Sequence, residues 1–181
     1  MAGEQLKESL THCVRELYTA EQHQARALPA LLAAATTPQL KHALHAHLRE
    51  TAQQARRLER VFTLLDEPIR WARCPGMLGI LEECQSAMED HAGGAMRDAA
   101  IIATAQRLDY YEMAAYGAAA AWAETLGLTT VAELLNQCLD EEIATADELL
   151  AVALTRVHVA AGCAERPAGR IAVPGSVAAG A

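Results

Sequence analysis

The sequence reads Asp109-Tyr110-Tyr111-Glu112-Met113-Ala114-Ala115-Tyr116-Gly117 in the middle of a long helical pattern. Glu112 stands where the apolar stripe of that helix should continue, and Asp109 lies one turn earlier on the flank of the same face. The rest of the stripe is apolar and comprises Ile101, Ala105, Leu108, Ala115, Ala119, Trp122 and Leu126. Because burying a charge is costly, a carboxylate within such a stripe indicates a polar site in a helical core.

The same interruption recurs in three other helical segments. Glu21 interrupts the stripe of residues 4–34, and Glu142 interrupts that of residues 130–156. In residues 38–66 the middle of the stripe is polar, with His47, Thr51 and Gln54 on it and Glu50 at its edge. Each interruption falls near the midpoint of its segment. In a bundle of helices of similar length the midpoints share one layer, so we expect these carboxylates to meet.

Two short links and one long link organise the predicted helices 4–34, 38–66, 95–126 and 130–156. Thr36-Thr37-Pro38 separates the first two, with a threonine hydroxyl as the expected cap, and Gly127 with Thr129 or Thr130 separates the last two. Such short links predict antiparallel hairpins. Residues 77–91 read as a short crossover helix in the long link. The expected fold is an all-α, ferritin-like four-helix bundle made of two antiparallel hairpins.

Composition sets limits on domains and partners. The 181 residues suit one domain, which we predict to be a helical bundle over residues 1–159. Residues 160–181 are rich in Ala, Gly and Pro and are expected to form a flexible tail. Docking of this tail to a partner is a minor alternative. A net charge of −8 argues against nucleic-acid and membrane partners. The five cysteines form no Cys-x-x-Cys pair, and no signal-like segment is apparent, so we expect a reducing cytoplasm.

The carboxylate layer needs something that neutralises it. Several unpaired buried charges would rival the ~5–15 kcal/mol stability of a whole domain. The stripes contain no Lys or Arg, which leaves shared protons or divalent cations. Oxygen ligands with one imidazole favour a divalent metal pair, with iron preferred and manganese or zinc as alternatives. A hydrogen-bonded network without metal, a small-molecule pocket, and glutamates that reach solvent from the edge of a stripe remain open readings.

At these residues the chain resembles the YciE/YciF-like family of ferritin-like bacterial proteins. The resemblance runs from about residue 10 to 153, and Tyr111-Glu112-Met113-Ala114-Ala115-Tyr116-Gly117 is its most specific part. It implies a ferritin-like fold, a homodimer and an association with bacterial stress responses. The acidic positions that it implies are Glu21, Glu50, Asp109, Glu112 and Glu142.

The chain departs from ferritin-like di-iron oxidases, which carry Glu-x-x-His on the second and fourth helices. Gln53 and Thr145 stand at those histidine positions here, which argues against oxidase or peroxidase chemistry. His47 can supply an imidazole from the other side of Glu50, or it can be a structural residue. The side chains expected to support the ligands are Tyr18, Gln53, Gln54, Tyr116 and Thr145.

Two functions follow from these expectations. The first is a di-metal carboxylate protein that handles iron or oxidants during stress, with Glu21, Glu50, Asp109, Glu112, Glu142 and His47 as metal ligands. The second is a non-catalytic helical assembly protein whose core carboxylates hold no metal and only fix the register of the helices. Metal content discriminates between them.

Overall fold

The computed structural model describes residues 2–91, 93–160 and 162, and all regular structure within these residues is helical. In chain order the elements are α1 (Ala2–Ala34), α2 (Pro38–Leu64), α3 (Pro75–Glu89), α4 (Gly94–Thr125), α5 (Thr129–Val152), a π-helical turn (Ala153–Val157) and α6 (His158–Ala160). The all-helical prediction is confirmed. The predicted tail lies outside the described residues, apart from Ala160 and Gly162.

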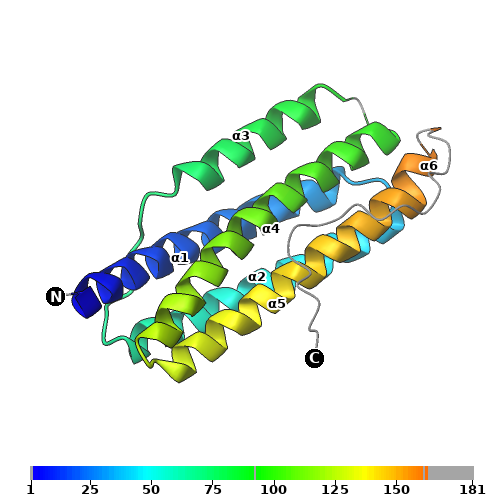
Figure 1. Cartoon of the computed structure of the whole chain (residues 1–181). Coiled ribbons are helices and arrows are strands. Elements are labelled where there is room, and N and C mark those ends of the chain that lie inside the picture. The colour runs from blue at the N-terminus through cyan, green and yellow to red at the C-terminus, as the bar shows by residue number, and fades with distance from the viewer. Residues whose placement is uncertain (1, 92, 161, 163–181) are drawn as a thin grey trace, which may run out of the picture.

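Four long helices lie side by side, and α3 lies outside them (Figure 1). Helix α1 packs against α2 and α4, and α5 packs against the same two helices, so each long helix has two long neighbours. Helix α3, which follows α2 and precedes α4 in the chain, runs along the outside of the molecule and packs against α4 and part of α1. Within the described residues, no helix is both long and apolar enough to cross a membrane.

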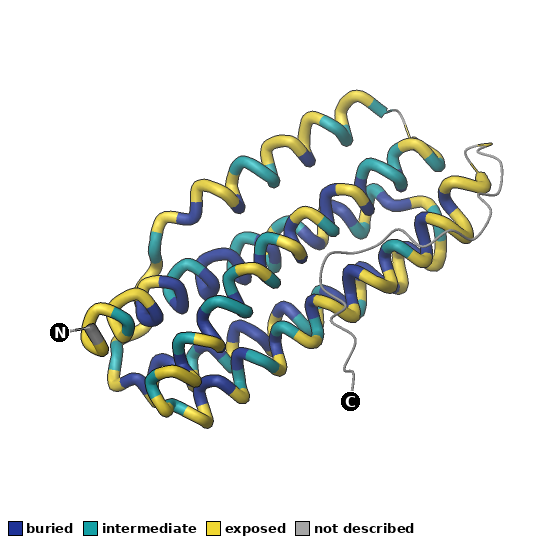
Figure 2. The backbone as a smooth tube through the Cα atoms, viewed as in Figure 1, coloured by how far each residue is buried: buried dark blue, intermediate teal, exposed yellow. Residues whose placement is uncertain are grey.

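Buried residues line the inner faces of the long helices (Figure 2). The apolar ones form two main clusters, one toward each end of these helices. The first unites Leu10, Val14, Leu17, Leu58, Phe62 and Leu135, among others. The second unites Leu28, Leu31, Leu40, Leu44, Ile101 and Leu149, among others. Burying a Leu or Phe side chain contributes about 1.5–3 kcal/mol, so these clusters hold the helices together. The middle of each helix, between the clusters, is left for polar side chains.

Helix α3 is attached through a small third cluster, in which Cys74 and Met77 pack against Ala20 of α1 and Leu108 of α4. Gly76 allows a close approach at this point, because a Cβ atom on it would lie 2.7 Å from Cε2 of Tyr111. The Tyr111 hydroxyl then lies 3.2 Å from the Cys74 sulfur. A glycine in the first turn of α3 therefore lets the crossover helix lie close against α4.

The helix starts differ from the expected caps. Thr37 is the N-cap of α2 but its side chain makes no cap hydrogen bond, and the N-cap of α5 is Leu128 instead of a threonine. The Thr37 hydroxyl donates instead to Asp98 of α4, at 2.5 Å. Three more donors reach the same carboxylate: the Thr36 N–H and hydroxyl, both at 2.8 Å, and the Thr37 N–H at 2.7 Å. The turn between α1 and α2 is thus fastened to the start of α4.

Candidate metal centre

Three helices bring acidic side chains into the layer between the two apolar clusters, and a fourth helix adds a histidine. Glu21 comes from α1, Asp109 and Glu112 from α4, and Glu142 from α5. The first three are 0% exposed and Glu142 is 1% exposed. His47 of α2, at 1% exposed, completes the layer. Each was expected from an interrupted apolar stripe, and the structure brings all five together.

Two groups of three side chains could each hold a metal ion. His47, Asp109 and Glu142 form one group, and Glu21, Glu112 and Glu142 form the other. Within each group, one potential ligand atom from every residue lies within 4.8 Å of the others. Glu142 belongs to both groups. A carboxylate has two oxygens, so this glutamate could contribute a ligand atom to either group.

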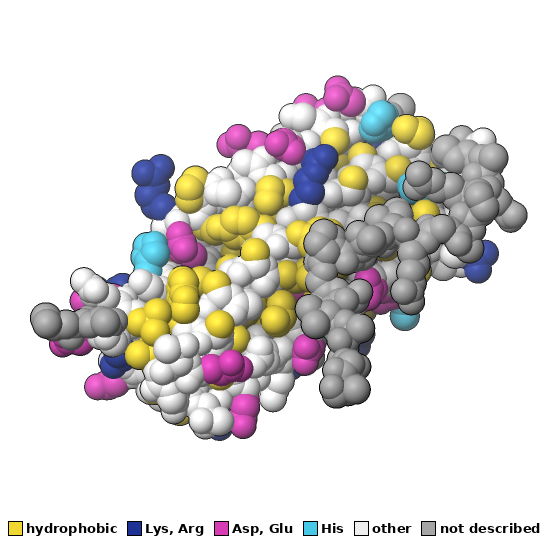
Figure 3. All heavy atoms as spheres, viewed as in Figure 1, with side chains coloured by type: hydrophobic (Ala, Val, Ile, Leu, Met, Phe, Trp, Pro, Cys, Tyr) yellow, Lys and Arg dark blue, Asp and Glu magenta, His cyan; other side chains and the backbone are white. Residues whose placement is uncertain are grey.

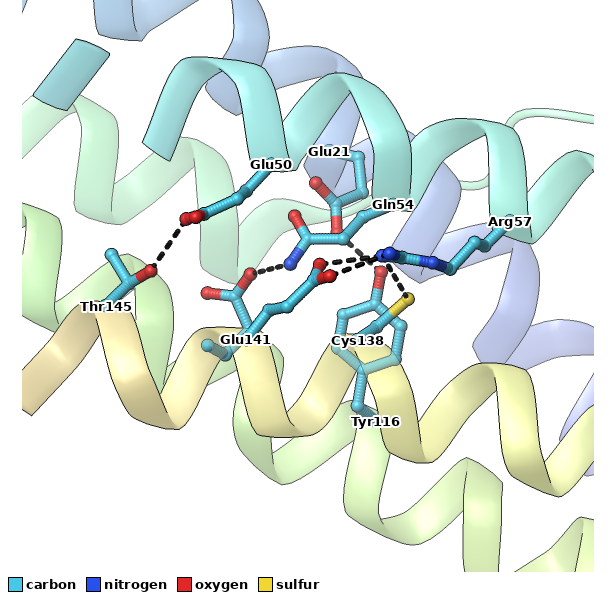
Figure 4. Close-up of polar contacts among 9 residues, drawn as sticks. Glu21, Glu50, Gln54, Arg57, Tyr116, Cys138, Glu141 and Thr145 are labelled. Atoms are coloured by element: carbon cyan, nitrogen blue, oxygen red, sulfur yellow. Dashed lines mark hydrogen bonds and ion pairs between the residues drawn. The ribbon is translucent and has the colours of Figure 1, made fainter. Parts of the chain in front are cut away.

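Neutral donors orient the carboxylates. Gln54 Nε2 donates to Glu142 Oε1 at 2.6 Å, and the Tyr116 hydroxyl donates to Glu21 Oε1 at 2.5 Å (Figure 4). Gln24 lies between His47 and Glu112. With its amide oriented to satisfy both neighbours, the nitrogen donates to Glu112 Oε1 at 2.9 Å and the oxygen accepts from His47 Nε2 at 2.7 Å.

Several oxygens in the layer are left without a hydrogen-bond partner. Within the described residues, neither oxygen of Asp109 has one, although the side chain is fully buried. The same holds for Glu21 Oε2, Glu142 Oε2 and His47 Nδ1. An unpaired buried polar atom costs about 1–3 kcal/mol, and more if the group is charged. These atoms are therefore available to a proton or a cation.

Burial and mutual repulsion shift the ionisation of the whole layer. Desolvation, with repulsion from Glu142, raises the pKa of Glu21 and of Asp109 well above the usual range of a carboxyl. Desolvation and repulsion from Glu21 do the same to Glu112, and the pKa of Glu142 rises to about 8, mainly because of desolvation. Desolvation lowers the pKa of His47 to about 4, so this imidazole is neutral at pH 7 and does not offset the acidic charge.

Four residues predicted for the site do not contact the layer of buried ligands. Glu50 is half-buried, belongs to neither group, and accepts a hydrogen bond from the Thr145 hydroxyl at 3.1 Å. Gln53 is exposed, because successive residues of a helix point in different directions and its neighbour Gln54 points inward. The Tyr18 hydroxyl donates to Glu59 of α2, at 3.2 Å. Thr145, expected to support the ligands, contacts Glu50 instead of a member of the layer.

Two supporting residues were not recognised from the sequence. No role was predicted for Gln24, although its amide joins His47 to Glu112. Cys138, on an inner stripe, lies 4.0 Å from Arg57 Nη1, and burial raises the pKa of its thiol to about 12. The signal for Gln24 was present, since it stands one turn after Glu21 on the same face.

The fold and the site together define an all-helical protein with a buried layer of carboxylates between its long helices. Residues 5–161 match the family described as Domain of unknown function (DUF892). The chain is 36% identical over 154 residues to protein YciF of Escherichia coli (strain K12), a match that covers 84% of this chain and 93% of that protein. The chain therefore belongs to this family, and the resemblance seen in the sequence is confirmed.

Solved structures agree with the family assignment. The structure of the E. coli stress protein YciF matches with a TM-score of 0.80 at 36% identity, covering 84% of this chain and 97% of that one. YcfI from Rhodopseudomonas palustris, described as a candidate structural protein, matches with a TM-score of 0.80 at 37% identity, covering 82% and 94%. A protein from Xanthomonas campestris shares the fold, with a TM-score of 0.69 at 21% identity. This match covers 87% of this chain and 97% of that one.

Proposed function

We propose that this protein is a ferritin-like four-helix bundle that holds a pair of divalent metal ions between α1, α2, α4 and α5. The ligands in this proposal are His47, Asp109, Glu21 and Glu112, with Glu142 shared between the two ions. The observation that carries the proposal is the state of Asp109. Its side chain is 0% exposed and both of its oxygens lack a hydrogen-bond partner within the described residues.

The charge balance of the layer supports a cation. His47 is neutral at pH 7 because its pKa lies at about 4. Arg57 lies at the edge of the layer, but its guanidinium is engaged by Glu141 through two hydrogen bonds of 2.6 and 2.7 Å. Four buried carboxyls then need either protons or metal ions to become neutral.

The donor set fits a particular group of metals. Carboxylate oxygens with one imidazole suit iron first, and manganese or zinc as well. A bound metal of this kind would supply Lewis acidity and, for iron or manganese, redox chemistry. The chain's own contribution is orientation, since Gln24, Gln54 and Tyr116 each hold one carboxylate by a hydrogen bond. The absence of histidine at Gln53 and Thr145 argues against oxidase chemistry of the rubrerythrin kind.

The biological setting follows from the relatives. The E. coli relative is called a stress protein, and we extend this to a cytoplasmic homodimer that handles iron or oxidants during stress. Helix α4 supports the dimer: Tyr110 and Met96 are 42% and 54% exposed on it, and Ala103, Ala114 and Ala121 are also exposed. An exposed apolar helix face is suited to contact with a second copy.

A second candidate function is structural. The hydrogen bonds from Gln24, Gln54 and Tyr116 would also stabilise protonated carboxyls, whose pKa values are raised by burial. Such a network would fix the register of the helices in a protein without metal. YcfI from R. palustris, which is described as a candidate structural protein, is consistent with this alternative.

Metal analysis of two matched variants decides between the candidates. Glu142→Gln removes the shared ligand and keeps the shape of the side chain, whereas Glu148→Gln changes an exposed glutamate on the same helix. Metal-free protein is loaded anaerobically with Fe²⁺ and, separately, with Mn²⁺, and bound metal is measured after gel filtration. We expect about two ions per chain in the wild type and in Glu148→Gln, and a marked loss in Glu142→Gln. Wild-type protein that retains no metal would establish the structural network instead.

A further inference from the structure

We propose that metal ions reach the buried layer through the seam between α2 and α5, where Glu50 captures the incoming cation and the Arg57–Glu141 ion pair covers the entrance. This inference rests on the proposed metal function, because it assigns a route to that same site. The seam is defined here by three side-chain pairs that bridge the two helices: Glu50 with Thr145, Gln54 with Glu142, and Arg57 with Glu141 (Figure 4).

Glu50 has the position expected of a capture residue. It is half-buried, whereas the acids of the layer are almost completely buried. Its Oε2 atom accepts one hydrogen bond, from the Thr145 hydroxyl at 3.1 Å. Thr145 lies one turn after Glu142 on α5, so Glu50 contacts the same stretch of α5 that carries the shared ligand. A carboxylate at the boundary between solvent and core attracts cations and can pass them inward.

Oxygen atoms lead from Glu50 toward the layer. Thr51 Oγ1 and Gln54 Oε1 are buried, and neither has a hydrogen-bond partner among the described residues. Both side chains are 0% exposed. The other end of the Gln54 amide donates to Glu142 at 2.6 Å, so this side chain extends from the seam to the shared ligand. Unpaired oxygens along a path can replace water molecules around a moving cation.

The Arg57–Glu141 pair covers the next turn of the seam. Arg57 Nη1 and Nη2 donate to the two oxygens of Glu141 at 2.6 and 2.7 Å, and the side chains are 22% and 28% exposed. Arg57 Nη1 also lies 4.0 Å from the Cys138 sulfur, which belongs to the apolar core. The guanidinium thus covers the core on one side and faces solvent on the other, and its positive charge repels an approaching cation.

The other three seams are closed by packing. Helix α3 covers the contact between α1 and α4 through Cys74, Met77, Ala20 and Leu108. Small residues bring α4 and α5 together, where a Cβ atom on Gly117 would lie 3.9 Å from Leu139. The rings of Tyr18 and Phe62 pack edge to face between α1 and α2, at 5.8 Å between centroids. Glu59 of α2 is also half-buried and accepts from Tyr18 of α1, but the α2–α5 seam carries three half-buried charged side chains, those of Glu50, Arg57 and Glu141.

Uptake kinetics test this route separately from binding. Metal-free protein is mixed with Mn²⁺ in a stopped-flow instrument, and a fluorescent indicator reports the free ion. Equilibrium stoichiometry is measured in parallel. Three variants are compared with the wild type: Glu50→Gln, Arg57→Met and, as a matched control, Arg15→Met. Arg15 forms an ion pair of similar exposure with Glu67, 25% and 30% against 22% and 28%, but outside the seam.

We expect Glu50→Gln to slow uptake about tenfold and Arg57→Met to accelerate it about tenfold, because local charge controls the encounter rate of an ion. Arg15→Met should leave the rate unchanged, and all four proteins should bind the same number of ions at equilibrium. Equal rates in all variants would overturn the route while leaving the metal site intact. Loss of equilibrium binding in Glu50→Gln would also overturn it, since Glu50 would then be a ligand. A wild type that binds no Mn²⁺ would refute the metal function and the route together.

Discussion

Asp98 and Asp109 are both buried aspartates on α4, but their surroundings have opposite effects on them. Asp98 accepts four hydrogen bonds from Thr36 and Thr37, which lower its pKa although burial alone would raise it. Asp109 accepts none from the described residues, and its pKa is raised by desolvation and by Glu142 and Glu21. Both side chains are 0% exposed.

The difference shows that burial does not by itself identify a functional acid. A carboxylate surrounded by donors is stabilised in its charged form, and it needs no ligand. A carboxylate without donors, next to other acids, has to find a proton or a cation. The space-filling view shows acidic side chains scattered over one face of the molecule (Figure 3). These exposed acids are solvated, so they do not indicate a functional site.

Removing the Asp98 carboxylate should have the largest effect on stability. Asp98→Ala leaves two backbone N–H groups and two hydroxyls without their acceptor, and we expect the free energy of unfolding to fall by about 3 kcal/mol. Urea denaturation measures the change. Asp147→Ala, at an exposed position of α5, is the control and should change stability by less than about 0.5 kcal/mol. A loss of similar size in both variants would contradict the proposed role of the four hydrogen bonds.

The two kinds of buried acid should destabilise the protein in opposite directions of pH change. The folded pKa of Glu142, about 8, lies above its ordinary value of 4.5, so the folded protein holds a proton that the unfolded chain releases. The free energy of unfolding of metal-free protein should therefore fall by about 2 kcal/mol as the pH rises from 6.5 to 8. Below pH 6.5 the depressed pKa of His47 begins to oppose this trend.

Asp98 behaves in the reverse sense. Because its folded pKa is lowered below 3.8, its contribution to the free energy of unfolding is complete above that pH and is lost as the pH falls further.

Saturating Mn²⁺ should remove the loss of stability that we expect between pH 6.5 and 8, since metal-bound carboxylates no longer need protons. Urea titrations with and without Mn²⁺ measure both effects, and stability that rises with pH in metal-free protein would disprove the raised pKa values.

Neutralising one acid of the layer should stabilise the metal-free protein. Glu142→Gln keeps an oxygen that accepts from Gln54, and an amide does not have to take up a proton on folding as a carboxyl with a raised pKa does. At pH 7 we therefore expect the free energy of unfolding to rise by about 1–2 kcal/mol. Thermal and urea unfolding report it. Glu148→Gln should be neutral, and a destabilised Glu142→Gln variant would show that the carboxylate is already compensated.

The smallest effect on stability should come from removing one of the four hydrogen-bond donors around Asp98. Thr37→Val removes the hydroxyl that donates at 2.5 Å and leaves the backbone donor in place. We expect a loss of about 0.5–1 kcal/mol. Thr125→Val provides the comparison, because the Thr125 hydroxyl bonds only to Ala121 of its own helix at an exposed position. Equal losses in the two variants would mean that the hydroxyl of Thr37 contributes nothing specific.

The all-helical fold and most of the acidic layer could be predicted because both follow from local periodicity. Glu21, Glu112 and Glu142 each interrupt an apolar stripe, and such a stripe fixes the inward direction to within about one residue. Gln53 and Gln54 were both predicted to support the ligands. Gln54 stands on the stripe and faces the layer, whereas Gln53 was named as the counterpart of a histidine in ferritin-like oxidases and is exposed. The uncertainty in the inward direction explains Glu50, which lies at the edge of the stripe and is half-buried.

Interactions between distant segments could not be predicted in this way. Asp98 appears in the sequence as an ordinary acid near the start of a helix, and Thr37 as an ordinary cap. Their contact depends on how the second hairpin lies on the first, which no local pattern specifies. The pairing of Tyr18 with Glu59 has the same origin, since it depends on the rotation of α1 against α2.

The Asp98 contact also has a consequence for the folding pathway. It joins residues 61 positions apart in the chain and closes a loop that contains all of α2 and α3. The entropy lost on closing a loop grows only slowly with its length, by about 0.6 kcal/mol for each doubling, so even this long loop closes at modest cost. Closure is slow compared with helix formation, however, because it requires a non-local encounter. We therefore expect the Asp98 contact to form late, when two hairpins dock, and to influence how fast the protein unfolds more than how fast it folds.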